Sequence, residues 1–229
     1  MKKLILAILM TFGIFTMVSA DIGVKLGVSA QIGSMETSGK ETSSDATATT
    51  KTSSTEEALF GTAGFFIEKD LAFLPGPFGR LSVGFDNIAH DLDLGSQSNY
   101  RERTLGAGGA VELKSKHTLE AEVTDFETLY ATLNVTDWLY LKSGTTSLSV
   151  KTTESLETTG SYPNVELDGT MWGFGVHNQR DNGIFFRVEA NYYDIDGVTV
   201  NNSNADSVMQ VKLDGINGAT AKASIGKAF

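Results

Sequence analysis

Cysteine is absent from the 229-residue chain, proline occurs only three times, and basic residues are outnumbered by acidic ones, 18 to 28. The absence of cysteine excludes a disulfide scaffold, a cysteine-ligated zinc or iron–sulfur site, and a cysteine nucleophile. So few prolines beside 24 glycines exclude collagen and proline-rich linker proteins. The formal net charge of −10 argues against nucleic acid as a partner, because its binders need clustered lysine and arginine.

A long apolar run is also missing, except for a short one at the N-terminus. Two lysines precede an apolar stretch from Leu4 to Met17, and Val18-Ser19-Ala20 then supplies the small residues that signal peptidase accepts. About 14 apolar residues fall short of the roughly 20 that a membrane-spanning helix needs. The sequence therefore predicts a cleaved signal peptide at residues 1–20, a mature domain at 21–229, and export by a Gram-negative bacterium.

The mature chain alternates between apolar and polar residues, which is the period of a β-strand. From Ile22 to Ile32 the even positions are apolar and the odd positions are glycine or polar. This segment has the length that a tilted strand needs to cross a bilayer, roughly 9–11 residues. We predict eight strands in total. The alternation recurs clearly at 80–86, 128–135, 184–193 and 219–226, and with an ambiguous phase at 58–69, 139–150 and 167–176.

The connections between the predicted strands alternate between long and short. Residues 36–57 form a long connection in which twelve of the nineteen residues from Thr37 to Thr55 are serine or threonine, which predicts a mobile, solvated loop. Residues 70–79 and 136–137 are short connections. Long loops at one end and short turns at the other are typical of a closed, antiparallel, up-and-down transmembrane β-barrel, an all-β fold. Two alternatives stay open: a soluble β-sandwich, and a ten-stranded barrel in which 102–119 adds a hairpin.

With this pattern the chain resembles the small eight-stranded outer-membrane β-barrels, such as the OmpA membrane domain and the opacity-like surface proteins. The most specific element is the C-terminal strand, Ala219–Phe229, which ends in an aromatic residue. The resemblance implies that Phe229, with Ile225 and Ala223 before it, is the signal that the barrel-assembly machinery reads. The sequence of the chain is also similar to barrels of marine alphaproteobacteria to which no activity is assigned, at Leu129–Ala131, Trp138–Lys142 and Ser224–Lys227.

An eight-stranded barrel is just wide enough to be filled by its own side chains, so a wide pore is not expected. Unpaired charges in a narrow, low-dielectric interior are unfavourable. We therefore expect the polar face to form ion pairs and hydrogen bonds across the lumen; a gated or selective conduit is the alternative. The predicted lumen-lining residues are Lys25, Gln31, Arg80, Asp86, Glu120, Glu122, Arg187, Glu189 and Lys222.

Signatures of an enzyme, a cofactor or a metal site are weak. The only histidines, His90, His117 and His177, are scattered and lack the spacing of a catalytic triad. Asp194 and Asp196 have the hard oxygens that calcium and magnesium prefer, but neither they nor the acidic residues after His90 match an EF-hand spacing. We therefore expect no catalytic residue, cofactor or metal site; bridging of these acidic residues to lipopolysaccharide by divalent cations stays open as an alternative.

The sequence thus predicts a non-enzymatic protein of the outer membrane that presents long polar surface loops for a structural, adhesion or recognition role. A narrow porin-like channel for ions or small solutes is the alternative. The expected partners are outer-membrane lipid and lipopolysaccharide, the barrel-assembly machinery during biogenesis, and a surface ligand whose chemistry the sequence does not give. Aromatic residues near the predicted strand ends, such as Trp138 and Tyr192, are interpreted as interfacial girdles.

Overall fold

The computed structural model describes residues 22–44, 49–104, 112–155, 161–203 and 208–229 of the chain. Within these ranges lie ten strands and one short 3₁₀ helix. In chain order the elements are β1 (Val24–Ser44), β2 (Thr49–Asp70), η1 (Gly76–Arg80), β3 (Leu81–Ile88), β4 (Leu92–Thr104), β5 (Glu112–Asn134), β6 (Leu139–Ser155), β7 (Val165–Gln179), β8 (Ile184–Ile195), β9 (Val198–Asn201) and β10 (Val208–Ala228).

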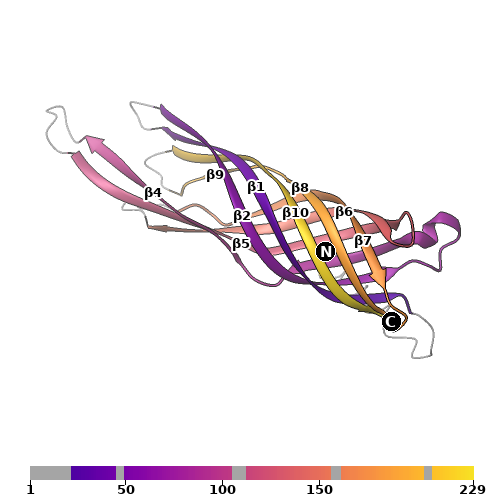
Figure 1. Ribbon diagram of the computed structural model, residues 1–229. Helices are drawn as coiled ribbons and strands as arrows, with labels where there is room; N and C mark the ends of the chain where they lie inside the picture. The colour runs from indigo at the N-terminus through magenta and orange to yellow at the C-terminus, as the bar shows by residue number, and fades with distance from the viewer. Residues whose placement is uncertain (1–21, 45–48, 105–111, 156–160, 204–207) are drawn as a thin grey trace.

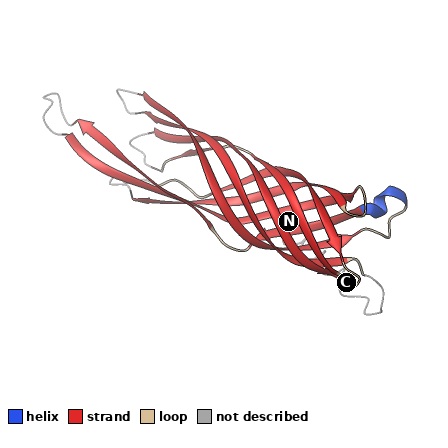
Figure 2. Cartoon of the chain, in the orientation of Figure 1, coloured by secondary structure: helices blue, strands red, loops and turns tan. Residues whose placement is uncertain are grey.

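Eight of these strands close into a barrel, as Figures 1 and 2 show. Around the wall the order is β1, β2, β3, β5, β6, β7, β8 and β10, and β10 pairs with β1 to complete the ring. All of these pairings are antiparallel. The predicted closed, antiparallel, eight-stranded barrel is therefore confirmed, and the single closed ring rules out a sandwich of two sheets.

The alternative of a ten-stranded barrel depended on an extra hairpin at 102–119. A hairpin does form there, between β4 and β5, but it does not widen the barrel. Within the described residues β4 pairs with β5 alone, from Leu92↔Val123 to Thr104↔Glu112. The first part of β5 lies beyond the stretch that pairs with β3. The hairpin therefore lengthens the wall past the end of the barrel, where it projects as a separate arm in Figure 1.

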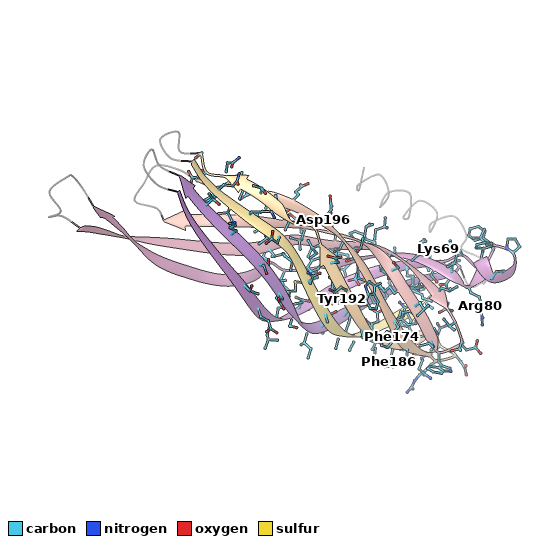
Figure 3. All side chains as sticks on the ribbon, turned by 90° about the horizontal axis from the view of Figure 1, so that it is seen from above. Lys69, Arg80, Phe174, Phe186, Tyr192 and Asp196 are labelled. Carbon is cyan, nitrogen blue, oxygen red and sulfur yellow. The ribbon has the colours of Figure 1, made fainter. Side chains whose placement is uncertain are left out.

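The alternation of the sequence gives the wall an apolar outer face. On β1, Leu26, Val28 and Ile32 are 45%, 59% and 69% exposed, whereas Ser29 and Gln31 between them are buried. An apolar belt this large on the outside of a closed wall matches a hydrocarbon environment. No helix in the described ranges is long and apolar enough to span a membrane. Other exposed members of the belt, of which Phe174 and Phe186 are labelled in Figure 3, include Phe65, Leu129, Leu133, Leu141, Trp172, Phe174, Val176, Phe186, Val188 and Ile225.

The two ends of the barrel differ. The short connections between strands lie at one end, where the first and last strands also meet: the N–H of Phe229 donates to the carbonyl of Val24 at 2.9 Å, and the reverse bond spans 3.3 Å. The opposite end carries the long continuations of β1, β2, β4 and β5, which reach well past the barrel in Figure 2. These are called the short-turn end and the extended end below.

The prediction of a mobile loop at 36–57 is wrong for most of its length. β1 and β2 stay paired without a shift in register from Val24↔Lys69 to Ser44↔Thr49, and residues 45–48 lie outside the described part. Threonine is a good strand former, and the hydrogen-bond ladder satisfies the backbone without needing apolar side chains. The segment rich in serine and threonine therefore continues the wall as a long hairpin.

Four large rings on the inner face each lie against a glycine of the neighbouring strand. A side chain at Gly84 would place its Cβ 2.4 Å from the Tyr130 ring, so only glycine lets that ring approach the wall so closely. In each case the ring and the glycine are direct cross-strand partners. This arrangement leaves the centre of the barrel to charged side chains. The four pairs are Gly27 with Phe66, Gly84 with Tyr130, Gly175 with Tyr140, and Gly226 with Phe185.

Replacing Gly84 with alanine is expected to destabilise the barrel by about 1–3 kcal/mol, because the buried Tyr130 ring must move to make room. The measurement is urea unfolding of the refolded protein in lipid vesicles, followed by tryptophan fluorescence. Gly61→Ala is the matched control: its added Cβ would find its nearest neighbours at 3.9 Å, and its effect should stay within about 0.5 kcal/mol. An equal loss of stability in the two variants would contradict this packing.

Candidate functional site

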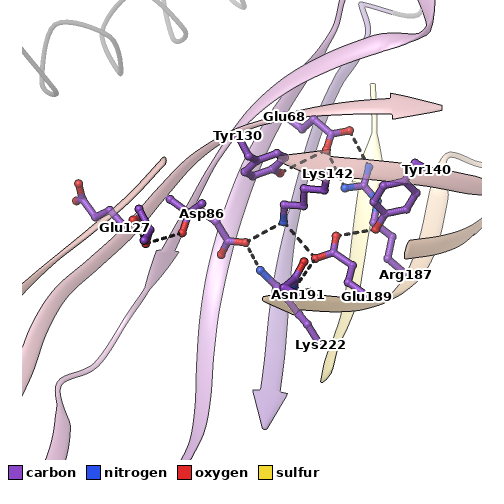
Figure 4. Close-up of polar contacts among 12 residues, drawn as sticks. Glu68, Asp86, Glu127, Tyr130, Tyr140, Lys142, Arg187, Glu189, Asn191 and Lys222 are labelled. Atoms are coloured by element: carbon purple, nitrogen blue, oxygen red, sulfur yellow. Dashed lines mark hydrogen bonds and ion pairs between the residues drawn. The ribbon is translucent and has the colours of Figure 1, made fainter. Parts of the chain in front are cut away.

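Charged side chains from six strands meet inside the barrel, in the half near the short-turn end. Figure 4 shows the centre of this cluster. At the centre, the Arg187 guanidinium on β8 donates two hydrogen bonds to Glu68 on β2, from Nη1 to Oε2 at 2.8 Å and from Nη2 to Oε1 at 2.7 Å. Tyr130 Oη donates to Glu68 Oε2 at 3.3 Å. Arg187 and Glu68 are only 6% and 1% exposed, so this two-bond pair is shielded from water.

A second carboxylate, Glu189 on β8, joins the opposite side of the lumen to the same network. Tyr140 Oη donates to Glu189 Oε1 at 2.6 Å, and Lys142 Nζ donates to Oε2 at 3.1 Å. The Asn191 amide donates to Oε2 at 3.4 Å. Lys142 also lies 3.6 Å from Asp86 Oδ2, which makes the lysine a bridge between two carboxylates on different strands.

Two further lysines, Lys222 and Lys25, complete the network. Lys222 on β10 forms an ion pair with Asp86. Lys25 on β1 lies 3.3 Å from Glu68 and 2.6 Å from Asp70, which in turn accepts a hydrogen bond from Ser82 at 2.6 Å. The network is therefore balanced in charge, since it joins four cations (Lys25, Lys142, Arg187, Lys222) to four carboxylates (Glu68, Asp70, Asp86, Glu189).

The rings that lie against the glycines surround the cations of this network. The Arg187 guanidinium carbon is 4.7 Å from the centre of the Phe185 ring, 5.4 Å from that of Phe66 and 5.5 Å from that of Tyr140. Lys142 Nζ lies 3.9 Å from the centre of the Tyr130 ring. The ring faces add a favourable cation–π contact and displace water from the space around the charges.

Towards the extended end the interior changes character and becomes apolar. The side chains of Phe126 and Tyr193 meet edge to face with ring centres 5.6 Å apart. Leu148, Leu167 and Met171 beside them are at most 3% exposed. The barrel is thus filled by two layers in series, a charged network and an apolar cluster. The buried members of the cluster are Val123, Phe126, Tyr130, Leu148, Leu167, Met171, Tyr193, Ile195 and Ile216.

A small polar cavity of about 10 Å³ lies where the two layers meet. Its lining includes Asp86 and Lys222 of the network and Phe126 and Tyr193 of the cluster. A space of this size is close to the minimum that holds one water molecule. Gln31 Oε1 and Thr62 Oγ1 also belong to buried side chains on its wall, and neither has a hydrogen-bond partner among the described residues. The cavity therefore suits a single hydrating water and is too small for an organic solute.

Five of the predicted lumen-lining residues meet in the network: Lys25, Asp86, Arg187, Glu189 and Lys222. Gln31 is buried on the wall of the cavity. The sequence reasoning missed Asp70, which it assigned to the connection 70–79, and also missed Glu68, Lys142 and the two tyrosines as network members. Glu68, Lys142 and Tyr140 lie on strands whose phase was ambiguous, and the glycine paired with each ring is the signal that identifies the inner face.

The prediction is wrong for Arg80 and Glu122. Arg80 ends the 3₁₀ helix, before the alternation of β3 begins; its side chain is exposed, and Nη1 donates to the Val135 carbonyl at 3.2 Å. Glu122 is exposed because β5 carries a bulge, with a shift in register between Thr124 and Glu127 and a φ of 54° at Asp125. One extra residue moves every side chain beyond it to the opposite face. The side chain of Glu120 lies outside the described part.

The proposed assembly signal lies at the seam between β10 and β1. Ala223 and Ile225 point outward and are exposed, and Phe229 is 48% exposed beneath Lys227, whose Nζ is 5.4 Å from the ring centre. Recognition of these residues by the assembly machinery stays a prediction. The predicted signal peptide lies outside the described residues.

The described histidines have local structural contacts. His90 Nε2 accepts from the backbone N–H of Ala63 at 3.1 Å, and His177 lies 5.7 Å from the Tyr140 ring, so the two are at different levels of the wall. The side chain of His117 is outside the described part. Among the described residues no group of three or more His, Asp or Glu side chains is placed to hold a metal ion.

No family model matches the chain, and no curated protein matches its sequence. Solved structures with a similar fold include the outer membrane protease OmpT from Escherichia coli, which is 8% identical with a TM-score of 0.45 over 94% of this chain and 99% of that one. The outer membrane protein OprG from Pseudomonas aeruginosa is 11% identical with a TM-score of 0.42 over 89% and 97%. The attachment invasion locus protein Ail of Yersinia pestis is 12% identical with a TM-score of 0.34 over 87% and 98%. Likeness at this level says nothing about activity.

The class of the protein follows from the chain itself. A closed wall leaves no unpaired strand edge within the barrel, an apolar belt covers the outside, and a charged network and an apolar cluster fill the inside. Only helices and closed barrels satisfy the backbone within a bilayer, and barrels of this kind belong to the outer membrane. The protein is an integral outer-membrane β-barrel.

Replacing Glu189 with leucine is expected to destabilise the barrel by about 3–5 kcal/mol, because Tyr140 and Lys142 lose their shared acceptor in a buried site. The measurement is urea unfolding in vesicles. Asp214→Asn is the control, since Asp214 pairs with Lys212 at 2.6 Å but the two side chains are 51% and 58% exposed. An exposed pair contributes about 0–1 kcal/mol. Similar losses for the two variants would show that the interior pair is not shielded.

Proposed function

We propose that this protein is a non-enzymatic surface scaffold of the outer membrane, with a closed lumen and a partner-binding surface on its extended strands. The single observation that carries the proposal is the filling of the lumen by two layers in series. A solute would have to break the Glu68–Arg187 pair and then displace the apolar cluster. The proposed role is adhesion or recognition, and a narrow channel for ions or small solutes is the alternative that the same interior must be tested against.

The location of exposed polar surface supports the scaffold. Above the apolar belt, the outer faces of the wall carry exposed carboxylates, among them Glu36, Glu57, Asp194 and Asp214. The β1–β2 and β4–β5 hairpins continue past the barrel (Figure 1). A long paired hairpin presents a rigid polar surface, and rigid surfaces lose less entropy on binding than a mobile loop does.

Absence of an enzymatic role is part of the proposal. OmpT is named as a protease, so the fold itself is compatible with catalysis. In this chain His90 ends a strand ladder and His177 lies against a tyrosine, which gives both rings a structural role. The buried carboxylates Glu68 and Glu189 each form an ion pair with a buried cation. In the proposed role they are structural ion-pair partners and not catalytic bases.

Vesicles that contain the refolded wild-type protein are expected to retain both small ions and small sugars, because the two layers block the lumen. The measurement is leakage of a trapped dye and of trapped sugars, with a heat-dependent gel shift to show folding. The double variant Glu68→Ser, Arg187→Ser removes the central pair without leaving an unpaired charge. Because the apolar cluster stays in place, the double variant should also retain both solutes; ion leakage of the double variant alone would contradict the second layer and locate the block at this pair. Solute leakage through the wild type that changes with Arg187→Ala would establish the channel instead.

Shortening the β1–β2 hairpin is expected to leave the barrel intact. Gly39 and Ser54 are cross-strand partners that share backbone hydrogen bonds, so replacing residues 40–53 with Asn-Gly keeps the register and supplies a two-residue turn. Folding is measured by the gel shift, and the surface role by adhesion of cells that display the full and the shortened protein. If the shortened protein folds and adheres as well as the full one, this hairpin is not part of the partner-binding surface.

A further inference from the structure

The outer edge of β2 is open above the level at which β3 ends. β2 pairs with β3 from Asp70↔Ser82 to Gly64↔Ile88, while its pairing with β1 on the other edge continues to Thr49. The chain leaves the wall after Ile88 and returns as β4, which pairs with β5. Among the described residues no strand pairs with the outer edge of β2 between residues 49 and 63.

The direction of the backbone groups along this edge follows from Ala63. Its carbonyl accepts from Ala89 N–H at 3.1 Å, and its N–H donates to His90 Nε2 at 3.1 Å, so both groups of Ala63 point to the outer edge. In an antiparallel strand this direction alternates with each residue. The register with β1 has no shift here. Gly61, Leu59 and Glu57 therefore direct their N–H and C=O groups to the open edge, and the residues between them bond to β1.

His90 marks the lower limit of the open edge. Its ring replaces the backbone carbonyl that a longer β3 would offer to Ala63, and its Nδ1 contacts the Asp91 carbonyl at 3.1 Å. A strand added to β2 must therefore begin above Ala63. The lower part of the wall, beside the lumen network, stays sealed.

The side chains along the edge indicate what would fit there. Leu59 is 85% exposed, the largest exposure among the large hydrophobic side chains described. Glu57 is exposed and lies directly opposite Glu36 on β1, which places two like charges side by side. Like charges in direct cross-strand contact are unfavourable, and an opposite charge beside them is favourable. A lysine or arginine on an added strand would lie next to Glu57 on the outer face.

We infer that the outer edge of β2, from Thr55 to Gly61, binds an extended polypeptide segment of another protein by strand addition. The segment carries a basic residue beside Glu57 and an apolar residue beside Leu59. Backbone hydrogen bonds to the alternate residues of β2 supply the affinity, and the two side-chain positions supply the preference. The inference rests on the proposed role of the extended strands in recognition and names the class of partner.

Binding is measured with a fluorescent peptide of alternating threonine and valine with one central lysine, titrated with the refolded protein in detergent micelles. Leu59→Pro removes an N–H that points to the open edge and breaks no bond to β1, because proline is tolerated on edge strands. Leu59→Thr is the matched control, since it removes the leucine but keeps the N–H. We expect Leu59→Pro to weaken binding about tenfold relative to Leu59→Thr, the loss of one backbone hydrogen bond.

Two further readouts separate strand addition from adsorption by charge. Glu57→Lys is expected to reverse the preference between the lysine peptide and one with glutamate in its place. Hydrogen exchange in the free protein should be fast at 57, 59 and 61 and slow at 58 and 60, and the peptide should slow the first set. Equal binding by the proline and threonine variants, no binding by the wild type, or protected amides at 57, 59 and 61 without peptide would each overturn the inference. The leakage test of the closed lumen is independent of these results.

Discussion

The closure of eight strands into a narrow ring is the constraint on which the rest of the structure depends. An interior of that width has little room for water, so each charge on the inner face must find its partner across the lumen. Arg187 and Glu68 meet this requirement with two hydrogen bonds, and six other charged groups arrange themselves around that pair. The glycines opposite the four rings are part of the same solution, because they let the aromatic side chains stay at the wall.

Two layers of side chains close the interior of the barrel, one charged and one apolar. The charged network connects six strands near the short-turn end. Removing one charged side chain there leaves its partner buried and unpaired. The apolar cluster continues the core towards the extended end, and it gives β5 to β8 a packed inner face at the level where the wall begins to open. With the lumen occupied in this way, the outside of the extended strands is the surface that remains for partners.

The strand pattern made the fold predictable where the alternation is unbroken. On β1, β8 and β10 the period of two continues through the membrane belt, so Lys25, Arg187, Glu189 and Lys222 could be assigned to the inner face from sequence. The bulge at Asp125 is a local feature of the backbone that the side-chain pattern does not reveal. Because of it, Glu122 lies on the outer face and not on the predicted inner face. Glu68 and Lys142 were missed because β2 and β6 carry apolar or hydroxyl residues on both faces. The paired extension of β1 and β2 was missed because a polar composition is compatible with a strand when the backbone ladder is its only requirement.

The most direct test of the account is a double-mutant cycle between Glu68 and Arg187, measured as free energies of unfolding in lipid vesicles. Glu68→Gln and Arg187→Met are compared singly and together with the wild type. A shielded, two-bond pair predicts a coupling of about 2–3 kcal/mol, with the double variant more stable than the sum of the single effects implies. Additive effects within about 0.5 kcal/mol would contradict the account, because they would mean that water and not the partner satisfies each charge.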